Sequence, residues 1–389
     1  MNVIERAELL VLSYQYKDDE IWGWPGGTYR GWTTAFVRLT DTSGGQGLGE
    51  IGDGLNTPKL IPAIFDRAAS QVEGLPVCPR TVVDALARSA PGWGEAGLFQ
   101  SVIAGFELAV VDLLGTRVGV PAHALFGGAQ RKVMPAYASG GLSQSADAIH
   151  EEVLGYVARG FDAVKIRIGF GPSEDEDRVA AARSALGEER RLMVDLGASY
   201  LPSPPDHRDV VDLYERLHPY GIYWLEDPLP RRDVSGYVRL RDELPTRIAA
   251  GENERGEDLI RRWLDAGAID ILQTDALYVG GVLRQLELAD LAAHWGVRLA
   301  PHTWCSGPGL MANLTAAAVA PNGVFVEVPQ PPNPFREGPL REQLRFDGGG
   351  VVLPETPGLN VLLPESMEQM RFDESAGPVL FNAHKAVTR

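Results

Sequence analysis

Short apolar segments alternate with amphipathic helical segments in eight units between residues 133 and 345, and this alternation limits the possible folds more than any other feature. Strands that alternate with helices pair in parallel, because each helix returns the chain to the same edge of the sheet. Eight such units in about 200 residues are typical of a closed TIM-type β/α barrel. The expected strands are VMPAYAS (133–139), AVKIRI (163–168), RLMVDL (191–196), IYWLED (222–227), RIAAGE (247–252), DILQTD (270–275), VRLAPH (297–302) and VFVEVP (324–329).

An open, doubly wound parallel sheet is the alternative to the barrel. Nucleotide-binding sheets of that kind carry a Gly-rich phosphate-binding turn directly after a strand. None of the eight expected strands is followed by such a turn. The closed barrel is therefore the favoured fold.

The segments on either side of the barrel have different patterns. Residues 1 to about 50 carry three strand-like runs, and the following residues, up to Gly119, have the periodicity of helices. The sequence thus predicts an α/β protein with an α+β domain over 1–128 and a barrel over 129–345. The Gly- and Pro-rich tail, 346–389, is expected to return to the first domain.

The composition excludes several classes of function. Of the 389 residues, 44% are apolar, which suffices for a large core, and the net charge of −16 argues against binding to nucleic acid or anionic membranes. We find no secretory signal and no apolar run of membrane-spanning length. Cys78 and Cys305 form no metal or redox motif. These features predict a cytoplasmic protein without a membrane or nucleic-acid partner.

Charged residues stand at the ends of most of the expected strands. In β/α barrels the chemistry takes place at the C-terminal ends of the strands, so polar residues there are candidates for catalysis. In the strand 163–168, alternation places two cations on the face opposite to the aliphatic residues. The series in chain order is Lys165 with Arg167, Asp195, Glu226 with Asp227, Glu252, Asp275, His302 and Glu327.

Asp195, Glu226 and Glu252 follow three adjacent strands and should converge at the mouth of the barrel. Carboxylates brought together without a counter-ion raise one another's pKa and are costly to bury. A divalent cation removes this cost, and ligation by oxygen alone favours Mg²⁺ over zinc. Each acid taken singly could instead cap a helix or lie on the surface, but three acids at one structural position favour a metal site.

Asp275 and His302 lie one β-α unit apart, so their side chains are expected to be neighbours. A carboxylate behind an imidazole fixes its tautomer and raises its basicity, which is the arrangement of a general base. A single histidine is usually structural. The position of His302 just past an apolar strand, with an acid where its partner should be, favours the catalytic interpretation.

Seven motifs then follow one another along the chain: VKIR, MVDLG, WLEDP, AAGEN, LQTDALYVGG, APHTW and FVEVP. In this order and spacing they resemble the mandelate racemase branch of the enolase superfamily. The resemblance covers nearly the whole chain, because the helical segment GFELAVVDLLGTRVGVPAHALFGG and the Gly-rich tail match as well. It implies that residues 1–128 form a capping domain over a modified (β/α)₈ barrel, with the tail packed back on the cap.

The resemblance also implies a chemistry. Members of the family bind Mg²⁺ through the acids found here as Asp195, Glu226 and Glu252, with Asp227 behind them. Their shared first step removes the proton α to a carboxylate and forms a metal-stabilised enediolate, a charge that the metal and nearby cations must absorb. By resemblance, Lys165 lies beside the substrate carboxylate and Glu327 contacts that carboxylate as a hydrogen-bond donor.

Arg167 departs from the family pattern, in which many members have a lysine that acts as a base. A guanidinium has a pKa above about 12 and is a permanent donor, not a base. His302 is then the base on one face of the substrate, which favours proton abstraction at C2 followed by loss of the 3-hydroxyl. The alternative is that Arg167 pairs with a barrel acid and touches no substrate.

We therefore predict a magnesium-dependent lyase that dehydrates a small-molecule sugar acid, an aldonate or aldarate, to a 2-keto-3-deoxy acid. A racemase or epimerase, or a lactone cycloisomerase of a hydroxy acid, is the alternative on the same scaffold. A non-catalytic sugar-acid binder that retains the metal site is a third possibility. The apolar helices of the capping domain favour a homo-oligomer.

The loop KDDEIWGWPGGTYRGW, residues 17–32, is too long for a simple hairpin. We expect Trp22, Trp24 and Tyr29, with Asp18 and Asp19 nearby, to close the site and select the substrate. The alternative is an aromatic loop that packs on a partner subunit.

Two further positions bear on the pocket. Gly197 stands where the family often has a polar residue, commonly Asn, so one substrate hydrogen bond is missing or replaced. Trp304, two residues after His302, either lines the pocket or packs in the core.

Overall fold

A computed structural model describes residues 2–373 and 380–382 of the chain. The N-terminal part is an antiparallel sheet in the order β1 (Ile4–Gln15), β4 (Gly31–Asp41), β5 (Gln46–Ile51), covered by helices α1 (Ile61–Val72), α2 (Pro79–Ser89) and α3 (Leu98–Val118). Close packing of α3 on β5 depends on glycine. A Cβ at Gly49 would overlap the carbonyl oxygen of Gly105, so the helix and strand backbones can touch only because both residues lack side chains.

Helix α3 is buried between this sheet and the rest of the protein. Its length and apolar composition would allow it to cross a membrane, contrary to the expectation that no segment has this property. The helix is a core helix here, since most of its residues are buried. The charged residues Glu107 and Asp112 in its buried face bind backbone N–H groups of other segments.

The second part is a barrel of eight parallel strands, as predicted. They are β6 (Val133–Gly140), β7 (Ala163–Arg167), β8 (Arg191–Asp195), β9 (Ile222–Glu226), β10 (Arg247–Ala250), β11 (Ile271–Leu272), β12 (Arg298–Leu299) and β13 (Val326–Pro329). Neighbours pair in chain order from β6 to β12. Pairing of β13 with β6, and a bridge between Leu299 and Gly323 just before β13, close the ring.

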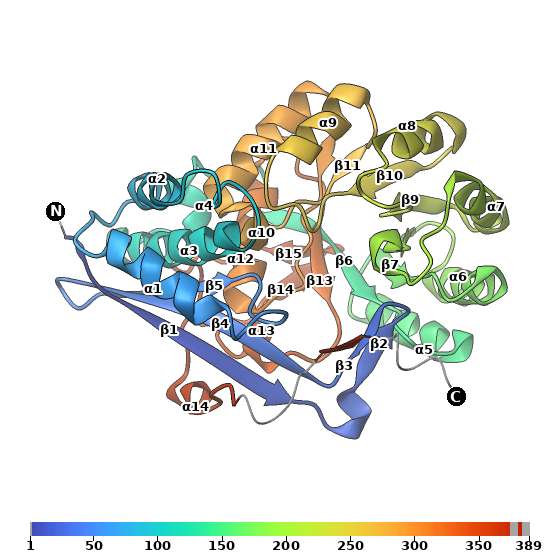
Figure 1. Cartoon of the computed structure of the whole chain (residues 1–389). Coiled ribbons are helices and arrows are strands. Elements are labelled where there is room, and N and C mark those ends of the chain that lie inside the picture. Colours follow the sequence, from blue (N-terminus) through green and yellow to red (C-terminus); the bar gives the residue numbers. More distant parts are fainter. Residues whose placement is uncertain (1, 374–379, 383–389) are drawn as a thin grey trace.

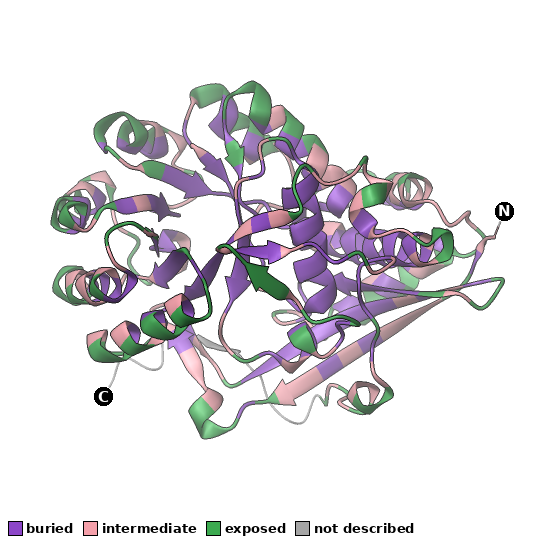
Figure 2. Cartoon of the chain, turned by 180° about the vertical axis from the view of Figure 1, so that it is seen from behind, coloured by how far each residue is buried: buried purple, intermediate pink, exposed green. Residues whose placement is uncertain are grey.

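Helices between the strands surround the barrel and show buried and exposed faces (Figure 2). They are α5 (Ala146–Ala158), α6 (Pro172–Leu186), α7 (His207–Leu217), α8 (Val234–Glu243), α9 (Asp258–Ala266), α11 (Val282–His294) and α12 (Gly307–Val319), with short α4 (Ala122–Leu125) before β6 and α10 (Ala276–Val279) before α11. Helix α9 shows the pattern, because Ile260, Trp263 and Leu264 are buried on one face and Gly267 ends it in the left-handed conformation. The helix that directly follows β13 is the short α13 (Pro334–Glu337), so the last β-α unit is a modified one.

The interior of the barrel is filled below the strand ends. One apolar residue from each strand or its immediate flank contributes to a buried cluster: Tyr137, Ala163, Met193, Trp224, Ala249, Ile271, Ala300 and Phe325. The rings of Tyr137 and Trp224 meet edge to face at 5.3 Å. This layer closes the barrel from below, so polar groups meet a cavity only at the C-terminal ends of the strands.

The long loop after β1 is folded rather than irregular. It contains a 3-10 turn, η1 (Asp18–Glu20), and a hairpin of β2 (Trp22–Trp24) and β3 (Gly27–Tyr29), which pairs with the distant β16 (Leu380–Asn382). Figure 1 shows this hairpin beside the barrel, while the long β1 and β4 run along the opposite flank with α1–α3. The C-terminal part of the chain thus contributes a strand to the sheet of the loop.

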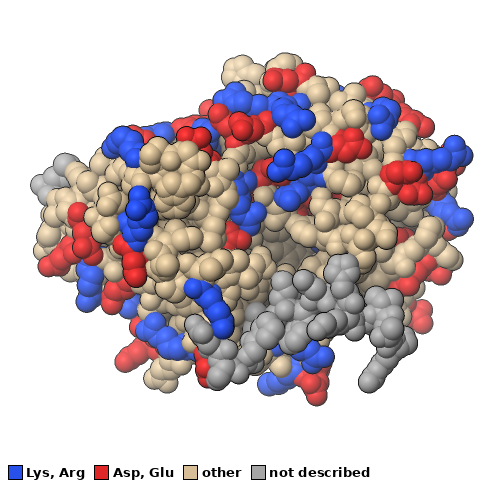
Figure 3. All heavy atoms as spheres, in the orientation of Figure 1, with Lys and Arg blue, Asp and Glu red and all other residues tan. Residues whose placement is uncertain are grey.

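The remainder of the C-terminal segment contacts both parts of the protein. Strands β14 (Arg345–Asp347) and β15 (Gly350–Val352) form a hairpin, and β15 pairs with β6 of the barrel. After α14 (Glu365–Glu368), the backbone at Met370 and Phe372 bonds to β1 of the first sheet. The predicted tail over 346–389 includes residues 374–379 and 383–389, which lie outside the described residues. On the face shown in Figure 3, acidic and basic side chains are interspersed rather than gathered into one patch.

Candidate active site at the mouth of the barrel

Three carboxylates meet at the ends of β8, β9 and β10. The strand register places Arg167 beside Asp195, and Asp195 beside Glu226, at one level of the barrel. Asp195, Glu226 and Glu252 are buried, and each offers an oxygen that lies within 4.8 Å of those of the other two. The predicted convergence of the three acids is therefore present in the structure.

Glu226 is the most enclosed of the three acids. Its Oε1 accepts a hydrogen bond from Lys165 Nζ at 2.6 Å, and its Oε2 accepts from Gln273 Nε2 at 2.7 Å and Trp224 Nε1 at 3.1 Å. Burial, which outweighs the attraction of Lys165, and the nearby Asp195 raise the pKa of Glu226 to about 8. The raised pKa shows that burial makes the ionised form of Glu226 costly unless a cation lies beside it.

Glu252 lies on the side of the cluster nearest His302. Its Oε1 accepts from Tyr200 at 2.8 Å and from Asn253 Nδ2 at 2.7 Å, and its Oε2 lies 3.7 Å from His302 Nε2. Burial acts to raise the pKa of Glu252, but His302 and then Arg167 reverse the effect and lower it. This carboxylate is therefore held in its ionised form.

Arg167 is an ion-pair partner of the cluster. Its Nη1 lies 2.9 Å from Asp195 Oδ1, and burial, which would lower its pKa, is outweighed by Asp195 and Glu252, so the pKa is raised. Its guanidinium also occupies the space that a side chain on Gly197 would need. The guanidinium of Arg167 therefore takes the place that a polar side chain at position 197 would fill.

Asp227 is an unusual member of the cluster. It is fully buried, has a positive φ of 42°, and neither of its side-chain oxygens has a hydrogen-bond partner among the described residues. A non-glycine residue in this conformation is strained, and such strain gathers at functional sites. Burial, followed by Glu252 and Asp195, raises the pKa of Asp227 well above its usual value.

The residues of this cluster fit a hard divalent cation. Buried carboxylate oxygens that face one another repel unless a cation or protons lie between them. Burial and neighbouring carboxylates raise the pKa of Glu226 and Asp227, and the side-chain oxygens of Asp227 are unpartnered, so a bound cation would favour the ionised cluster. Oxygen-only ligands are those that Mg²⁺ prefers. Asp195, Glu226 and Glu252 would hold it.

His302 and Asp275 form a second buried unit. His302 Nδ1 lies 2.9 Å from Asp275 Oδ2, and Asp275 Oδ1 accepts from Asn313 Nδ2 and from the backbone of Leu277, each at 2.9 Å. The hydrogen bond fixes Nδ1 as the protonated nitrogen and directs Nε2 towards Glu252 and the cavity. Burial acts to lower the pKa of His302, but Glu252 and then Asp275 raise it to about 9.

Glu327 lies among three hydrogen-bond donors. Its oxygens accept from Lys165 at 2.9 Å, from Trp304 Nε1 at 3.0 Å and from the backbone of Thr303 at 2.9 Å. Burial is opposed by Lys165 and His302, which lower the pKa of Glu327 to about 2. Its oxygens act as acceptors for these three donors. It holds Lys165, whose pKa the surrounding acids raise well above the usual value although burial opposes them.

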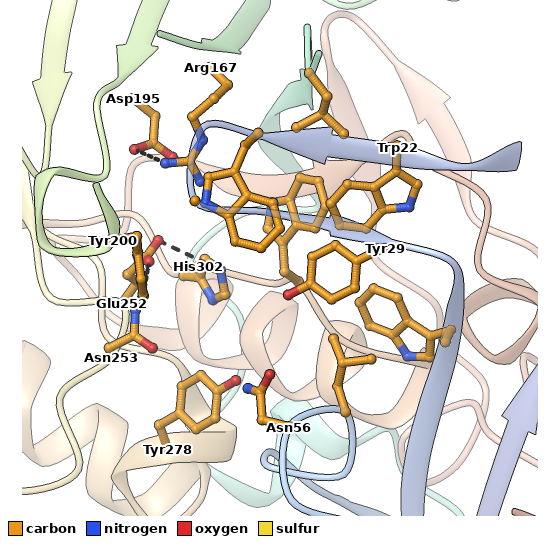
Figure 4. A pocket seen from close by; sticks show the side chains of 16 residues that line it. Trp22, Tyr29, Asn56, Arg167, Asp195, Tyr200, Glu252, Asn253, Tyr278 and His302 are labelled. Carbon is orange, nitrogen blue, oxygen red and sulfur yellow. Dashed lines mark hydrogen bonds and ion pairs between the residues drawn. The ribbon is translucent and has the colours of Figure 1, made fainter. Parts of the chain in front are cut away.

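A cavity of about 320 Å³ opens above these groups (Figure 4). Charged and polar residues form one side of the cavity, and the predicted aromatic residues of the loop form the other. The lining residues are Trp22, Trp24, Gly26, Tyr29, Trp32, Leu55, Asn56, Leu142, Arg167, Asp195, Tyr200, Glu252, Asn253, Tyr278, His302 and Trp304. Trp304 thus lines the pocket, whereas Asp18 and Asp19 lie exposed on η1 outside it.

Other predicted residues lie one layer further in. Lys165, Glu226, Asp275 and Glu327 are buried and do not line the cavity themselves. Each contacts a group that does, or that lies next to one: Lys165 is 3.8 Å from Asp195, and Asp275 bonds to His302. Only Arg167, Asp195, Glu252 and His302 of the predicted charged series face the cavity directly.

Several residues with a place in the site were not identified from sequence. Tyr200 and Asn253 hold Glu252, Gln273 holds Glu226, and Asn313 holds Asp275. Asn253 and Gln273 stand within the motifs AAGEN and LQTDALYVGG, so their position beside a strand end was a usable signal. Asn313 lies inside α12, where nothing in the local sequence points to Asp275.

Comparison with known proteins places these observations in context. Residues 148–367 match the sequence family described as enolase C-terminal domain-like. D-galactarolactone cycloisomerase of Agrobacterium fabrum is 35% identical over 280 residues, which cover 69% of this chain and 73% of that protein. Arabinonate dehydratase of Saccharolobus solfataricus is 28% identical over 288 residues, which cover 73% of this chain and 75% of that protein.

A solved structure shows the same fold. L-talarate/galactarate dehydratase from Salmonella typhimurium, crystallised with Mg and L-lyxarohydroxamate, superimposes with a TM-score of 0.85 at 23% identity. The match covers 96% of this chain and 93% of that one.

Proposed function

This chain belongs to the enolase C-terminal domain-like family, in the mandelate racemase branch of the enolase superfamily, and from that premise we propose that it is a magnesium-dependent sugar-acid dehydratase. The reaction removes the proton α to the carboxylate and then the 3-hydroxyl, and yields a 2-keto-3-deoxy acid. The observation that supports it best is the placement of one oriented imidazole, His302, beside three convergent carboxylates, with the guanidinium of Arg167 also facing the cavity.

Asp195, Glu226 and Glu252 are the proposed ligands of Mg²⁺. When bound, the cation would supply a Lewis acid that stabilises negative charge on the substrate carboxylate. The chain's own contribution is to fix the three carboxylates. Gln273, Trp224 and Lys165 hold Glu226, while Tyr200 and Asn253 hold Glu252.

His302 is the proposed base, and it acts through Nε2 because Nδ1 is bound to Asp275. Nε2 takes the proton from C2 and leaves an electron pair on the substrate. The same Nε2–H then protonates the 3-hydroxyl, the C3–O bond breaks, and the electron pair forms the C2–C3 double bond as water leaves. The resulting enol becomes the 2-keto acid, so one water is lost for each substrate consumed.

Arg167 and Lys165 are the proposed sources of positive charge. A guanidinium remains protonated, so Arg167 can stabilise a carboxylate or hydroxyl but cannot exchange a C2 proton on the second face. Lys165 lies 2.6 Å from Glu226 and 2.9 Å from Glu327. It therefore acts on the substrate indirectly, by compensating the charge of these two acids. A two-base racemase needs a proton acceptor on each face, which this arrangement does not favour.

A lactone cycloisomerase is the second candidate, because the relative that is 35% identical carries that activity in its name. In that reaction the same base would remove the α proton, and a ring carboxylate would leave instead of hydroxide. The two other candidate functions are an epimerase and a non-catalytic sugar-acid binder. We also propose that the protein is cytoplasmic and forms a homo-oligomer. Its proposed domains span residues 1–128 and 129–345, followed by the C-terminal segment 346–389.

The direct test is incubation with Mg²⁺ and a panel of aldonic acids, aldaric acids and their lactones, followed by assay of 2-keto-3-deoxy product. A dehydratase releases water, whereas a cycloisomerase consumes a lactone with no change in mass. An epimerase in deuterium oxide would place label at C2 of recovered substrate. His302→Ala is the control, and label at C2 without any keto acid would overturn dehydration.

A further inference from the structure

The side of the cavity opposite to the acids is aromatic and neutral. The rings of Trp22 and Tyr29 lie 4.2 Å apart, Trp24 stacks on Tyr29 at 5.0 Å, and Trp22 meets Trp304 at 5.0 Å. Figure 4 shows Trp22 and Tyr29 facing the group of Arg167, Asp195 and Glu252 across the cavity. Aromatic faces bind the C–H surface of a sugar chain or ring well, but they offer no counter-charge to an anion.

The cations that line the cavity are all on one side. Among the described lining residues, the positively charged side chains are Arg167 and His302. Each already lies against a carboxylate, Arg167 with Asp195 and His302 with Asp275 and Glu252. One substrate carboxylate can be held at this end. A second carboxylate among the half-buried aromatic rings would lose part of its water without gaining a cation from the described lining residues, which is unfavourable.

A cation close to one lining residue is also paired with a carboxylate. Arg255 lies against Tyr278, with its guanidinium carbon 4.4 Å from the centre of that ring. Its Nη2 and Nε bind Asp53 at 2.7 and 3.2 Å, and its Nη1 binds the carbonyl of Asn253 at 3.1 Å. Because its nitrogens are engaged by Asp53 and by the carbonyl of Asn253, Arg255 does not serve as a receptor for a distal carboxylate.

Two neutral polar residues also line the cavity. They are Tyr278 and Asn56, and both are labelled in Figure 4. Burial and then Asp53 raise the pKa of Tyr278 well above its usual value, so the hydroxyl stays uncharged. A phenol and a carboxamide each donate and accept hydrogen bonds, which matches sugar hydroxyls.

We infer that the substrate is a monocarboxylate with a neutral, hydroxylated distal end: an open-chain aldonate or a lactone with one free carboxylate, and not an open-chain aldarate. The inference rests on the proposed function, since it assigns the single carboxylate to the acid and metal end of the cavity. It restricts the substrates to acids whose distal carbon carries no charge. The rings of Trp22, Trp24 and Tyr29 would bind that uncharged end by stacking.

The test uses pairs of acids that differ only at the distal carbon. Each aldonate is compared with the aldarate of the same hydroxyl configuration, and with the corresponding aldarolactone, in saturating Mg²⁺. Turnover is measured as kcat/KM, and binding is measured separately by calorimetry on His302→Ala. We expect the aldonate or the lactone to exceed the open-chain aldarate by at least about 100-fold in both measurements, from the cost of an unpaired carboxylate.

A charge introduced at the outer end provides a second test. Asn56 is exposed at the rim of the cavity, so Asn56→Arg should leave the fold intact and place a cation near the distal carbon. At low ionic strength the preference should shift towards the aldarate by about three- to tenfold, the scale of an exposed ion pair. Asn56→Gln is the uncharged control. Leu60→Arg adds the same charge at an exposed position outside the cavity.

The outcomes separate this inference from the proposed function. Turnover of open-chain aldarates as efficient as that of aldonates and lactones would overturn the inference while dehydration stands. Selective binding of monocarboxylates to a protein that turns over none of them would support the inference about the cavity and overturn the proposed activity. Binding of no acid in the presence of Mg²⁺ would overturn both.

Discussion

The guanidinium of Arg167 fills the space next to the Cα of Gly197, so a Cβ on Gly197 would overlap Nη1. By the resemblance described above, both positions depart from the pattern expected of the family. The departures depend on each other, because an arginine at 167 needs the absence of a side chain at 197. The guanidinium reaches Asp195 at 2.9 Å from that position.

Gly197→Asn should therefore displace Arg167. The backbone can accept Asn, since φ is 55° and Asn tolerates the left-handed conformation better than most residues. Overpacking should cost about 1 to 3 kcal/mol of stability. Because the displaced guanidinium no longer faces the substrate, kcat/KM should also fall by about tenfold, which corresponds to about 1.4 kcal/mol of activation free energy. Arg167→Lys in the same chain should restore part of the loss. If the losses of kcat/KM in the two single variants simply add up in the double variant, the two positions are not coupled. Gly119→Asn, at a φ of 73° with open space around it, is the matched control.

His302→Asn should lower kcat by about 10² to 10⁴, the usual contribution of a general base, with little change in the melting temperature. His294→Asn, at an exposed position of α11, should retain activity. Circular dichroism melts of both variants give the stability comparison. Loss of kcat of similar size in both variants would indicate that the effect is not specific to the imidazole that faces the cavity.

The pKa of His302 should depend on the metal. Without a cation, Glu252 and Asp275 raise it to about 9, so the imidazole is protonated at pH 7 and cannot accept a proton. A cation on Glu252 removes the larger of these attractions, so the pKa must fall and the neutral base appears at lower pH. Imidazole NMR titration with and without Mg²⁺ measures this directly. A pKa that does not move on addition of Mg²⁺ would mean that Glu252 holds no cation.

Glu107 should make stability depend on pH. It is buried in α3 and accepts from the backbone of Val282 and Leu283 at the start of α11, and burial raises its pKa to about 7. The pKa of Glu107 is higher in the folded state than in the unfolded state, where it is near 4.5. Its contribution to the free energy of unfolding is therefore complete below pH 4.5 and is lost as the pH rises through about 7. Unfolding should therefore become easier from pH 5 to 8, by about 2 to 3 kcal/mol from this group.

The substitution Glu107→Gln removes this titration. The difference in unfolding free energy between wild type and variant, measured by urea at several pH values, should shift in favour of the variant between pH 5 and 8. Glu215→Gln, at an exposed position of α7, is the matched control. Parallel curves for wild type and Glu107→Gln across this range would show that the carboxylate does not titrate as described.

The barrel and its family could be predicted because their signals are local. Each strand is a short apolar run followed by a polar residue, as at Asp195 and Glu226, and parallel strands bring such ends to one edge. The fold and the resemblance are confirmed by the structure and the family match. Contact between Asp275 and His302 followed from the same reasoning, since the two residues end neighbouring strands.

Features that depend on distant contacts could not be predicted. The pairing of β3 with residues 380–382 joins segments about 350 positions apart, and no local pattern specifies such a register. The hydrogen bonds of Glu327 depend on Lys165, Trp304 and Thr303, which belong to other strands and loops. For the same reason, the support of Asp275 by Asn313 became visible only in three dimensions.

The central claim is that Asp195, Glu226 and Glu252 bind one dication. Anomalous diffraction from crystals grown with Mn²⁺ in place of Mg²⁺ tests it most directly, because Mn²⁺ accepts the same oxygen ligands and can be located by its own scattering. We expect a single peak at about 2.0 to 2.3 Å from an oxygen of each of the three carboxylates. The absence of a peak there at saturating Mn²⁺, with the three side chains still ordered, would contradict the account.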